Sequence, residues 1–281
     1  MAEVISNKKQ SDKTPEKEMS FWEHLEELRW HLVRSVIILL LLAIGAFIMR
    51  KFIFDVVILA PKEPDFITYR AFCALGKWLS IESLCIGTVP MEIVNIQMSG
   101  QFLTHVYVSL MVALVVAFPY LLWEIWSFVR PALLPKEKKY SQGAVFYSTV
   151  LFMVGMLFSY YLIVPLTINF FSSYQVSESV SNTITLSSYI STVVTLSLSC
   201  GLVFELPIVV FFLTKVGILT PSFMKKNRKY VLVILLTVAA IITPPDIFSQ
   251  IIVTIPLMLL YEFSILVSNQ VFKKQAANLA G

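Results

Sequence analysis

Long apolar runs, separated by short charged stretches, dominate this chain of 281 residues. A bilayer core about 30 Å thick needs about 20 mostly apolar residues for each helical crossing. The runs predict an all-α membrane protein with six transmembrane helices, at about 33–53, 100–123, 142–166, 186–214, 229–243 and 249–268. The fifth run is shorter than a full crossing, so that helix either thins the bilayer locally or stops within it.

Prolines mark two of the expected boundaries. Pro165 is expected to kink the third helix or to end it near the far side of the membrane. The sequence Thr243-Pro244-Pro245-Asp246 cannot lie inside a helix and predicts a tight turn between the last two helices, both of which are short.

Lys and Arg residues are unevenly divided between the two sides of the predicted membrane. Of the 22 in the chain, 17 fall on the side of the N-terminus. Cytoplasmic loops carry the excess of positive charge, so both termini are expected in the cytoplasm. Residues 1–20 are polar and lack the apolar segment of a cleaved signal sequence. They are expected to be a disordered cytoplasmic N-terminus, with a membrane domain over 21–270 and a cytoplasmic tail over 271–281.

The composition excludes several classes of function. Hydrophobic residues make up 57% and charged residues 14% of the chain, against about 45–50% and about 25% in soluble domains, so this is not a soluble globular protein. A net charge of +4 gives no basis for a nucleic-acid partner. The three histidines form no H-E-x-x-H motif, and neither G-x-S-x-G nor a P-loop occurs. The sequence therefore predicts no enzymatic activity, no metal site and no cofactor.

The segment from about 54 to 92, on the side of the membrane opposite the termini, carries Cys73 and Cys85. In an oxidising compartment these two thiols can pair. A disulfide is one hypothesis and two free thiols are the other, since spacing alone does not decide between them. Cys200 lies within the fourth span and is expected to be a small buried apolar residue.

Two carboxylates stand out on the basic, cytoplasmic side. Apolar residues repeat at helical spacing over 21–32 and predict an amphipathic helix at the membrane interface. Its Glu27 either awaits a cationic partner, or pairs internally with Arg29 or Arg34, or is simply solvated. Glu137 lies in a stiff loop after the second span, where the ordinary interpretation is a carboxylate at a positive helix N-terminus. Spacing alone favours the ordinary interpretation of both residues.

Glu205 is an acidic residue well inside the fourth span. An ionisable side chain at that depth costs at least about 2.5 kcal/mol, so it is expected to face a polar cavity or a partner. The alternative is a neutral, hydrogen-bonded structural glutamate. Glu124 and Glu262 also lie in apolar stretches, but nearer to the cytoplasmic end, where they can reach water.

Four motifs occur in order: H-L-E-E-L-R before the first span, F-V-R-P-A-L-L-P-K-E after the second, F-E-L-P in the fourth and T-P-P-D-I-F-S-Q before the sixth. Together they resemble the TatC family, the multispanning subunit of the twin-arginine protein translocase. The resemblance covers about residues 20–270, and six spans with both ends inside agree with it. It implies a concave, glove-like arrangement of the helices, with two short helices at the C-terminal end.

The resemblance implies a receptor in the plasma (inner) membrane of a bacterium. TatC proteins recognise signal peptides with paired arginines and, with the single-span partners TatA and TatB, move folded proteins across the membrane using the proton-motive force. Self-association and contact with membrane lipids are also implied. Glu27 and Glu137 match the family's acidic positions and are expected to bind the twin arginines, because a guanidinium binds a carboxylate bidentately and lysine does not. Arg29 and Phe128 match neighbouring positions and are expected to shape the same surface.

Three further residues match family positions. The resemblance makes Glu205 a polar anchor for an inserted signal hairpin or a TatA-type helix. It makes Pro61 and Asp246 structural or gating elements of the outer loops. Glu124 stands where many relatives have an uncharged polar residue, and it is expected to tune the cytoplasmic surface.

Two alternatives from other classes remain. A secondary transporter or channel would use Glu205 as an ion or proton site, but such proteins usually show internal repeats, and this sequence shows no similarity between its halves. A passive assembly scaffold would hold partner helices without reading a signal. In that case the removal of Glu27 and Glu137 would leave cargo recognition intact.

Overall fold

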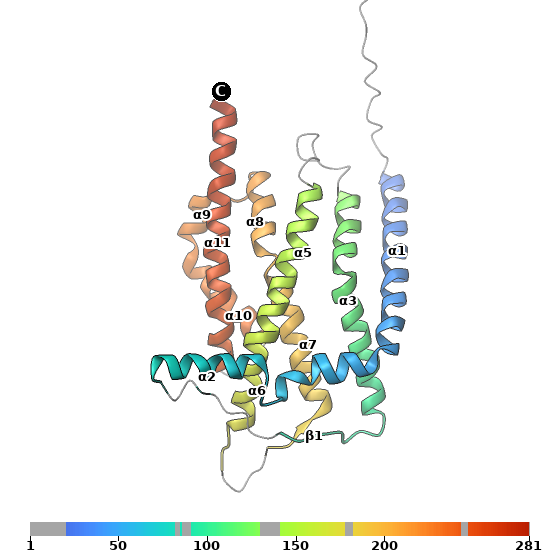
Figure 1. Cartoon of the computed structure of the whole chain (residues 1–281). Coiled ribbons are helices and arrows are strands. Elements are labelled where there is room, and N and C mark those ends of the chain that lie inside the picture. The colour runs from blue at the N-terminus through green and yellow to red at the C-terminus, as the bar shows by residue number, and fades with distance from the viewer. Residues whose placement is uncertain are drawn as a thin grey trace, which may run out of the picture.

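The structure is a computed structural model that describes residues 21–81, 85, 91–129, 141–177, 182–242 and 247–280. Within these ranges the chain is mostly helical, and the long helices stand side by side in one bundle (Figure 1). Three of the sequence predictions concern parts outside the described residues: the N-terminal 1–20, the loop with Glu137 and the turn with Asp246.

Among the described residues, five helical stretches are long and apolar enough to cross a membrane. They comprise α1 (Phe21–Ile48), α3 (Gly100–Val129), α5 (Ser141–Phe158) with η5 (Ser159–Ile163) and α6 (Val164–Ser173), α7 (Leu186–Val203) with α8 (Leu206–Lys215), and α11 (Ile247–Ala280). The short α9 (Pro221–Lys226) leads into α10 (Arg228–Ile242), whose 15 residues form the short helix predicted as the fifth span. The fold is therefore the all-α membrane fold that the sequence predicts. The expectation of two short helices at the C-terminal end holds for α10 but is wrong for α11, which has 34 residues.

The first span ends earlier than expected. α1 continues without a break from the predicted interfacial helix into the apolar run, but the chain turns at Met49 instead of extending to residue 53. Arg50 and Lys51 follow this turn and are exposed, so the chain leaves the apolar layer without burying them. The segments that follow lie across the end of the bundle opposite the start of α1 (Figure 1). These segments are η1 (Phe52–Ile58), which is π-helical, η2 (Ala60–Lys62) and α2 (Ile67–Leu79).

Pro165 does not end the third span. It lies in the first turn of α6, directly after η5, which is a π-helical segment. A proline in a first helical turn needs no N–H partner, and a π-helical turn loosens the i→i+4 pattern around it. The helix therefore continues to Ser173, and the expected end near residue 166 is too early.

The long helices pack in pairs: α1 lies along α3, α5 against α7, and α8 against α11. Two glycines allow the close approach of α5 and α7. A Cβ atom on Gly155 would lie 2.6 Å from the ring of Phe204, and one on Gly201 would lie 2.8 Å from the ring of Phe152. Phe152 also stacks on Phe118 of α3, with 3.6 Å between the ring centroids. This buried layer thus joins three helices.

Tyrosines fasten the segment that lies across the bundle end. Tyr160 of η5 donates a hydrogen bond to the carbonyl of Val57 at 2.6 Å, and Tyr189 of α7 donates one to the carbonyl of Ile58 at 2.9 Å. The last carbonyls of a helix have no partner within it, so donors from neighbouring elements satisfy them. We call these two bonds the tyrosine clamp.

Pro61, expected to be structural or gating, is buried in the same region. Its carbonyl accepts a hydrogen bond from the Tyr69 hydroxyl at 3.1 Å, and the same hydroxyl lies 3.2 Å from the carbonyl oxygen of Pro165. Burial raises the pKa of Tyr69 to about 12, so the phenol keeps the proton that it donates. Tyr69 therefore ties the η2 segment to the start of α6.

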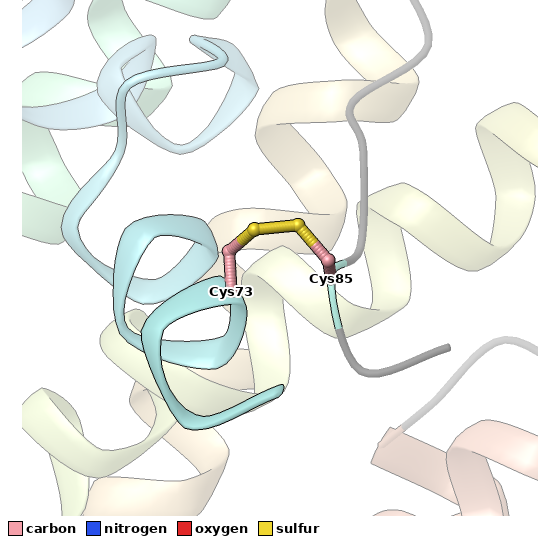
Figure 2. The surroundings of a disulfide bond; sticks show 2 residues. All are labelled: Cys73 and Cys85. Atoms are coloured by element: carbon pink, nitrogen blue, oxygen red, sulfur yellow. A yellow bond between two sulfur atoms is a disulfide. The ribbon is translucent and has the colours of Figure 1, made fainter. Parts of the chain in front are cut away.

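Two further links hold the loops on this side. β1 (Ile93–Val94) pairs in parallel with β2 (Ile184–Thr185). Figure 2 shows a disulfide between Cys73, on α2, and Cys85, in the segment that follows α2. Of the two hypotheses for these cysteines, the structure contains the disulfide. Cys200 is free and buried, as expected for a small apolar residue.

Candidate functional site

The start of α1 and the end of α3 lie side by side, at the end of the bundle that also carries the C-terminal end of α11 (Figure 1). Side chains from both helices form a connected group there, which we call the α1–α3 cluster. Its members are His24, Glu27, His31, Tyr120, Glu124 and Phe128.

Glu124 is the buried centre of the cluster, with 7% of its side chain exposed. Its Oε2 is hydrogen-bonded to His31 Nδ1, and its Oε1 accepts a hydrogen bond from the Tyr120 hydroxyl. A carboxylate only accepts, so His31 Nδ1 carries the proton of its bond. Both oxygens of this buried group are thereby satisfied, and the bond to His31 joins α3 to α1.

Glu27 faces the same group from α1. Its Oε1 lies 4.0 Å from His31 Nε2, and its Oε2 lies 3.8 Å from His24 Nδ1, so both contacts are electrostatic and too long for hydrogen bonds. Oε2 is buried and has no hydrogen-bond partner among the described residues. A buried carboxylate oxygen without a donor is costly. The position therefore favours a ligand that brings N–H groups.

Phe128 completes the cluster at the end of α3. Its ring stacks on that of His24 with 4.3 Å between centroids, and it meets His31 edge-on at 6.1 Å. Each imidazole is thus held between this aromatic ring and a carboxylate. The arrangement fixes the orientation of the two histidines beside Glu27.

Arg29 is not part of the cluster. Two residues along an α-helix correspond to about 200° of rotation, so Arg29 projects from a different face than Glu27, and it is exposed. The expected alternative, an internal pair of Glu27 with Arg29 or Arg34, is wrong for the described residues, because Glu27 lies against the two histidines. Arg34 acts electrostatically on Glu124 instead.

Sequence reasoning missed His24, His31 and Tyr120. A signal was present, because the two histidines flank Glu27 at spacings of three and four residues, and Tyr120 precedes Glu124 by four. Such spacings place side chains on one helix face. They do not reveal that the two faces meet across α1 and α3. Glu124, expected to tune this surface, lies at its centre.

Glu205 lies at the break between α7 and α8. Pro207, in the first turn of α8, cannot donate a hydrogen bond back into α7, which explains the break at this point. The Ser148 hydroxyl, on α5, hydrogen-bonds to the Glu205 carboxyl group. Oε1 of Glu205 is buried and has no hydrogen-bond partner among the described residues. The break therefore holds an incompletely satisfied polar group within a membrane-spanning stretch.

These features define a multi-pass helical membrane protein with polar side chains gathered at one end of the bundle and at the break between α7 and α8. The family model "Sec-independent protein translocase protein (TatC)" matches residues 23–256. The chain belongs to the TatC family and is a subunit of the twin-arginine (Tat) protein translocase, as its four motifs predict.

Individual relatives agree along almost the whole chain. TatC of Blattabacterium sp. subsp. Periplaneta americana is 42% identical over 265 residues, which cover 94% of this chain and 100% of that protein. TatCy of Bacillus subtilis is 31% identical over 257 residues, covering 92% and 91%. A crystal structure of "Twin Arginine Translocase Receptor- TatC" is 30% identical and superimposes with a TM-score of 0.67 over 89% of this chain and 99% of that one.

Proposed function

We propose that the α1–α3 cluster is the surface at which this translocase subunit binds the twin arginines of a signal peptide. The observation that carries the proposal is the carboxylate of Glu27, whose Oε2 is buried without a hydrogen-bond donor among the described residues. A guanidinium presents paired, coplanar N–H donors that fit such an acceptor, whereas an ammonium is a point charge. The crystallised relative is described as a receptor, which supports the same role.

The proposal assigns a part to each expected site residue. Glu27 binds one arginine, and Glu137, which lies between α3 and α5 in the sequence, binds the other. Phe128 stacks on His24 and so holds that imidazole beside Glu27, where it shapes the arginine contact. Arg29 is exposed on another face of α1, so it contributes to the rim of the surface and not to the arginine contact.

The proposed orientation places both termini in the cytoplasm of a bacterium and the protein in its plasma membrane. Figure 1 shows the start of α1 and the end of α11 at the same end of the bundle, so an even number of crossings is required. Five long stretches therefore need α10 as a sixth, although its length of about 22 Å is less than the bilayer core. The disulfide lies at the opposite end, which suits an oxidising outer compartment.

In the proposed mechanism the protein acts as a receptor, not as an enzyme. It works with single-span TatA- and TatB-type partners, associates with further copies of itself, and uses the proton-motive force to move folded cargo. The helices form a concave surface, within which Glu205 binds a polar group of an inserted signal hairpin or partner helix. Its buried Oε1, unpaired among the described residues, supports that role.

The test is site-specific crosslinking in membranes that contain the whole protein. A signal peptide with Arg-Arg carries the photoprobe next to the pair, and the same peptide with Lys-Lys is the specificity control. We expect the Arg-Arg peptide alone to crosslink to the first turns of α1. Glu27→Gln should reduce that crosslink about 10-fold, since it removes one charge-assisted contact.

Glu26→Gln is the matched control, because Glu26 is an exposed carboxylate one residue away on another face of α1. It should leave crosslinking unchanged. Assembly with partner subunits, measured by co-purification, should be the same for both variants. Full crosslinking by Glu27→Gln, or equal crosslinking of the Lys-Lys peptide, would support the scaffold alternative. Dependence of ion flux on Glu205 would support the transporter alternative.

A further inference from the structure

A cavity of about 490 Å³ lies at the other end of the bundle, where the end of α1, η1, the start of α3 and the start of α7 meet. It is separate from the α1–α3 cluster, and the proposed function makes no use of it. Its polar lining consists of Arg50, Lys51, Asp55, Gln101 and His105. Chain segments that are far apart in sequence thus bring two cations, one carboxylate, one amide and one imidazole to a single hollow.

The charged side chains of this cavity do not neutralise one another. Within the described ranges, Asp55 forms no ion pair with Arg50 or Lys51, although all three line the same space. Opposite charges at close range normally pair unless geometry keeps them apart. The acid and the bases can therefore each meet a ligand group of opposite charge, so the cavity suits a ligand that has an anionic and a cationic end.

His105 supplies a second acceptor. Its Nε2 donates a hydrogen bond to the carbonyl oxygen of Phe47 at 3.1 Å, because a carbonyl can only accept. The ring is stacked on Phe47 at 3.9 Å and meets Phe54 edge-on at 5.7 Å, so it is held in this orientation. The proton on Nε2 leaves Nδ1 of the neutral ring as an acceptor.

The position of the cavity indicates what kind of molecule carries these charges. The apolar run of α1 ends at Ile48, which is 76% exposed, and Arg50 follows two residues later. Phe102, also on the cavity wall, is 62% exposed. Apolar surface on the membrane side and charged groups at the rim match a molecule with acyl chains and a polar head.

We propose that this cavity binds the headgroup of a phospholipid that carries a primary ammonium group, of the phosphatidylethanolamine class. The phosphate lies between Arg50 and Lys51, which offer charge-assisted N–H donors. The ammonium lies against the Asp55 carboxylate and Nδ1 of His105. A phosphatidylcholine headgroup has no N–H to donate, and a phosphatidylglycerol headgroup has no cation, so each satisfies only part of the site.

The experiment is native mass spectrometry of the whole protein, delipidated in detergent and titrated with three lipids of identical chains. We expect phosphatidylethanolamine to bind at least about 10-fold more tightly than phosphatidylcholine, the difference that one charge-assisted hydrogen bond makes, and more tightly than phosphatidylglycerol. Inorganic phosphate and glycerophosphoethanolamine test the free headgroup, and neither should displace the lipid at equal concentration. Displacement by inorganic phosphate would show a small-anion site, and displacement by glycerophosphoethanolamine would show a site for the free headgroup; either result would overturn the lipid assignment.

Separate variants test the contact with the ammonium group and the contact with the phosphate group. Asp55→Asn should abolish the preference for phosphatidylethanolamine over phosphatidylcholine while both lipids still bind. Arg50→Gln with Lys51→Gln should weaken both lipids by about 10-fold or more. Arg70→Gln is the matched control, since Arg70 is an exposed cation of α2 outside the cavity. A preference for phosphatidylglycerol, or an unchanged preference in Asp55→Asn, would overturn the proposal; circular dichroism confirms that each variant is folded.

Discussion

The contact between α1 and α3 depends on the buried carboxylate of Glu124. Removing this carboxylate measures how much it contributes to the free energy of unfolding. Hydrogen bonds to a charged group contribute roughly 1.5–3 kcal/mol each, and Glu124 accepts one from His31 and one from Tyr120. Glu124→Ala leaves both donors without their partner in a position that is 7% exposed. We expect a loss of about 3 kcal/mol in the free energy of unfolding.

Glu124→Gln separates charge from shape. The amide oxygen of glutamine still accepts from the Tyr120 hydroxyl, and only the bond to His31 must rearrange. We therefore expect a loss of about 1 kcal/mol. Both losses are measured by denaturant titration in mixed micelles, followed by circular dichroism. A double-mutant cycle with His31→Ala isolates the pair, for which we expect a coupling energy of about 2 kcal/mol.

Glu262→Ala is the control, because Glu262 also makes a polar contact between two helices. Its partner is Arg228, at 2.6 Å, but the two side chains are 38% and 48% exposed. Exposed ion pairs contribute at most about 1 kcal/mol. Equal losses for Glu124→Ala and Glu262→Ala, or a coupling energy below about 0.5 kcal/mol, would refute the view that the cluster fixes α1 on α3.

Two further predictions concern other parts of the bundle. Glu205→Leu should leave the Arg-Arg peptide crosslink intact but abolish transport of a folded reporter. Glu205→Gln, which keeps a partner for Ser148, should retain most of the transport. Loss of the crosslink in Glu205→Leu would place Glu205 in recognition instead. Tyr189→Phe leaves the Ile58 carbonyl without its donor and should lower the free energy of unfolding by about 1–2 kcal/mol in the same titration. The control Tyr230→Phe, at a residue that is 59% exposed, should change the free energy of unfolding by less than about 0.5 kcal/mol. Equal values for the two variants would contradict the tyrosine clamp.

The fold class could be predicted because a bilayer imposes a length and a polarity on every crossing. The course of the helices at Met49 and Pro165 could not be predicted from the sequence. After Met49, the two cations Arg50 and Lys51 can either snorkel from a longer helix or leave the apolar layer, and sequence does not decide between these outcomes. The proline can end a helix or follow a π-helical turn, and only the packing around η5 selects the second.

The candidate site could be predicted only in part, because its side chains come from two helices that are far apart in the sequence. Glu27 and Phe128 were identified by motif, and they lie in one cluster. The link between His31 and Glu124 spans 93 positions in the sequence, so no helical spacing predicts it. The two cysteines illustrate the same limit, because their spacing permits a pair but only the fold of the segment after α2 brings the sulfur atoms together.

Polar contacts near both ends of α1 help to set its position on α3. Very little of α1 is buried in the bundle, and apolar contact between helices gains little where lipid is the alternative neighbour. Specific polar bonds therefore weigh more heavily in its register. Among the described residues, His31 is bonded to Glu124, and at the opposite end His105 of α3 is bonded to the Phe47 carbonyl at 3.1 Å. A ligand that draws on Glu27 and its histidines thus acts on a bond that holds α1 in place.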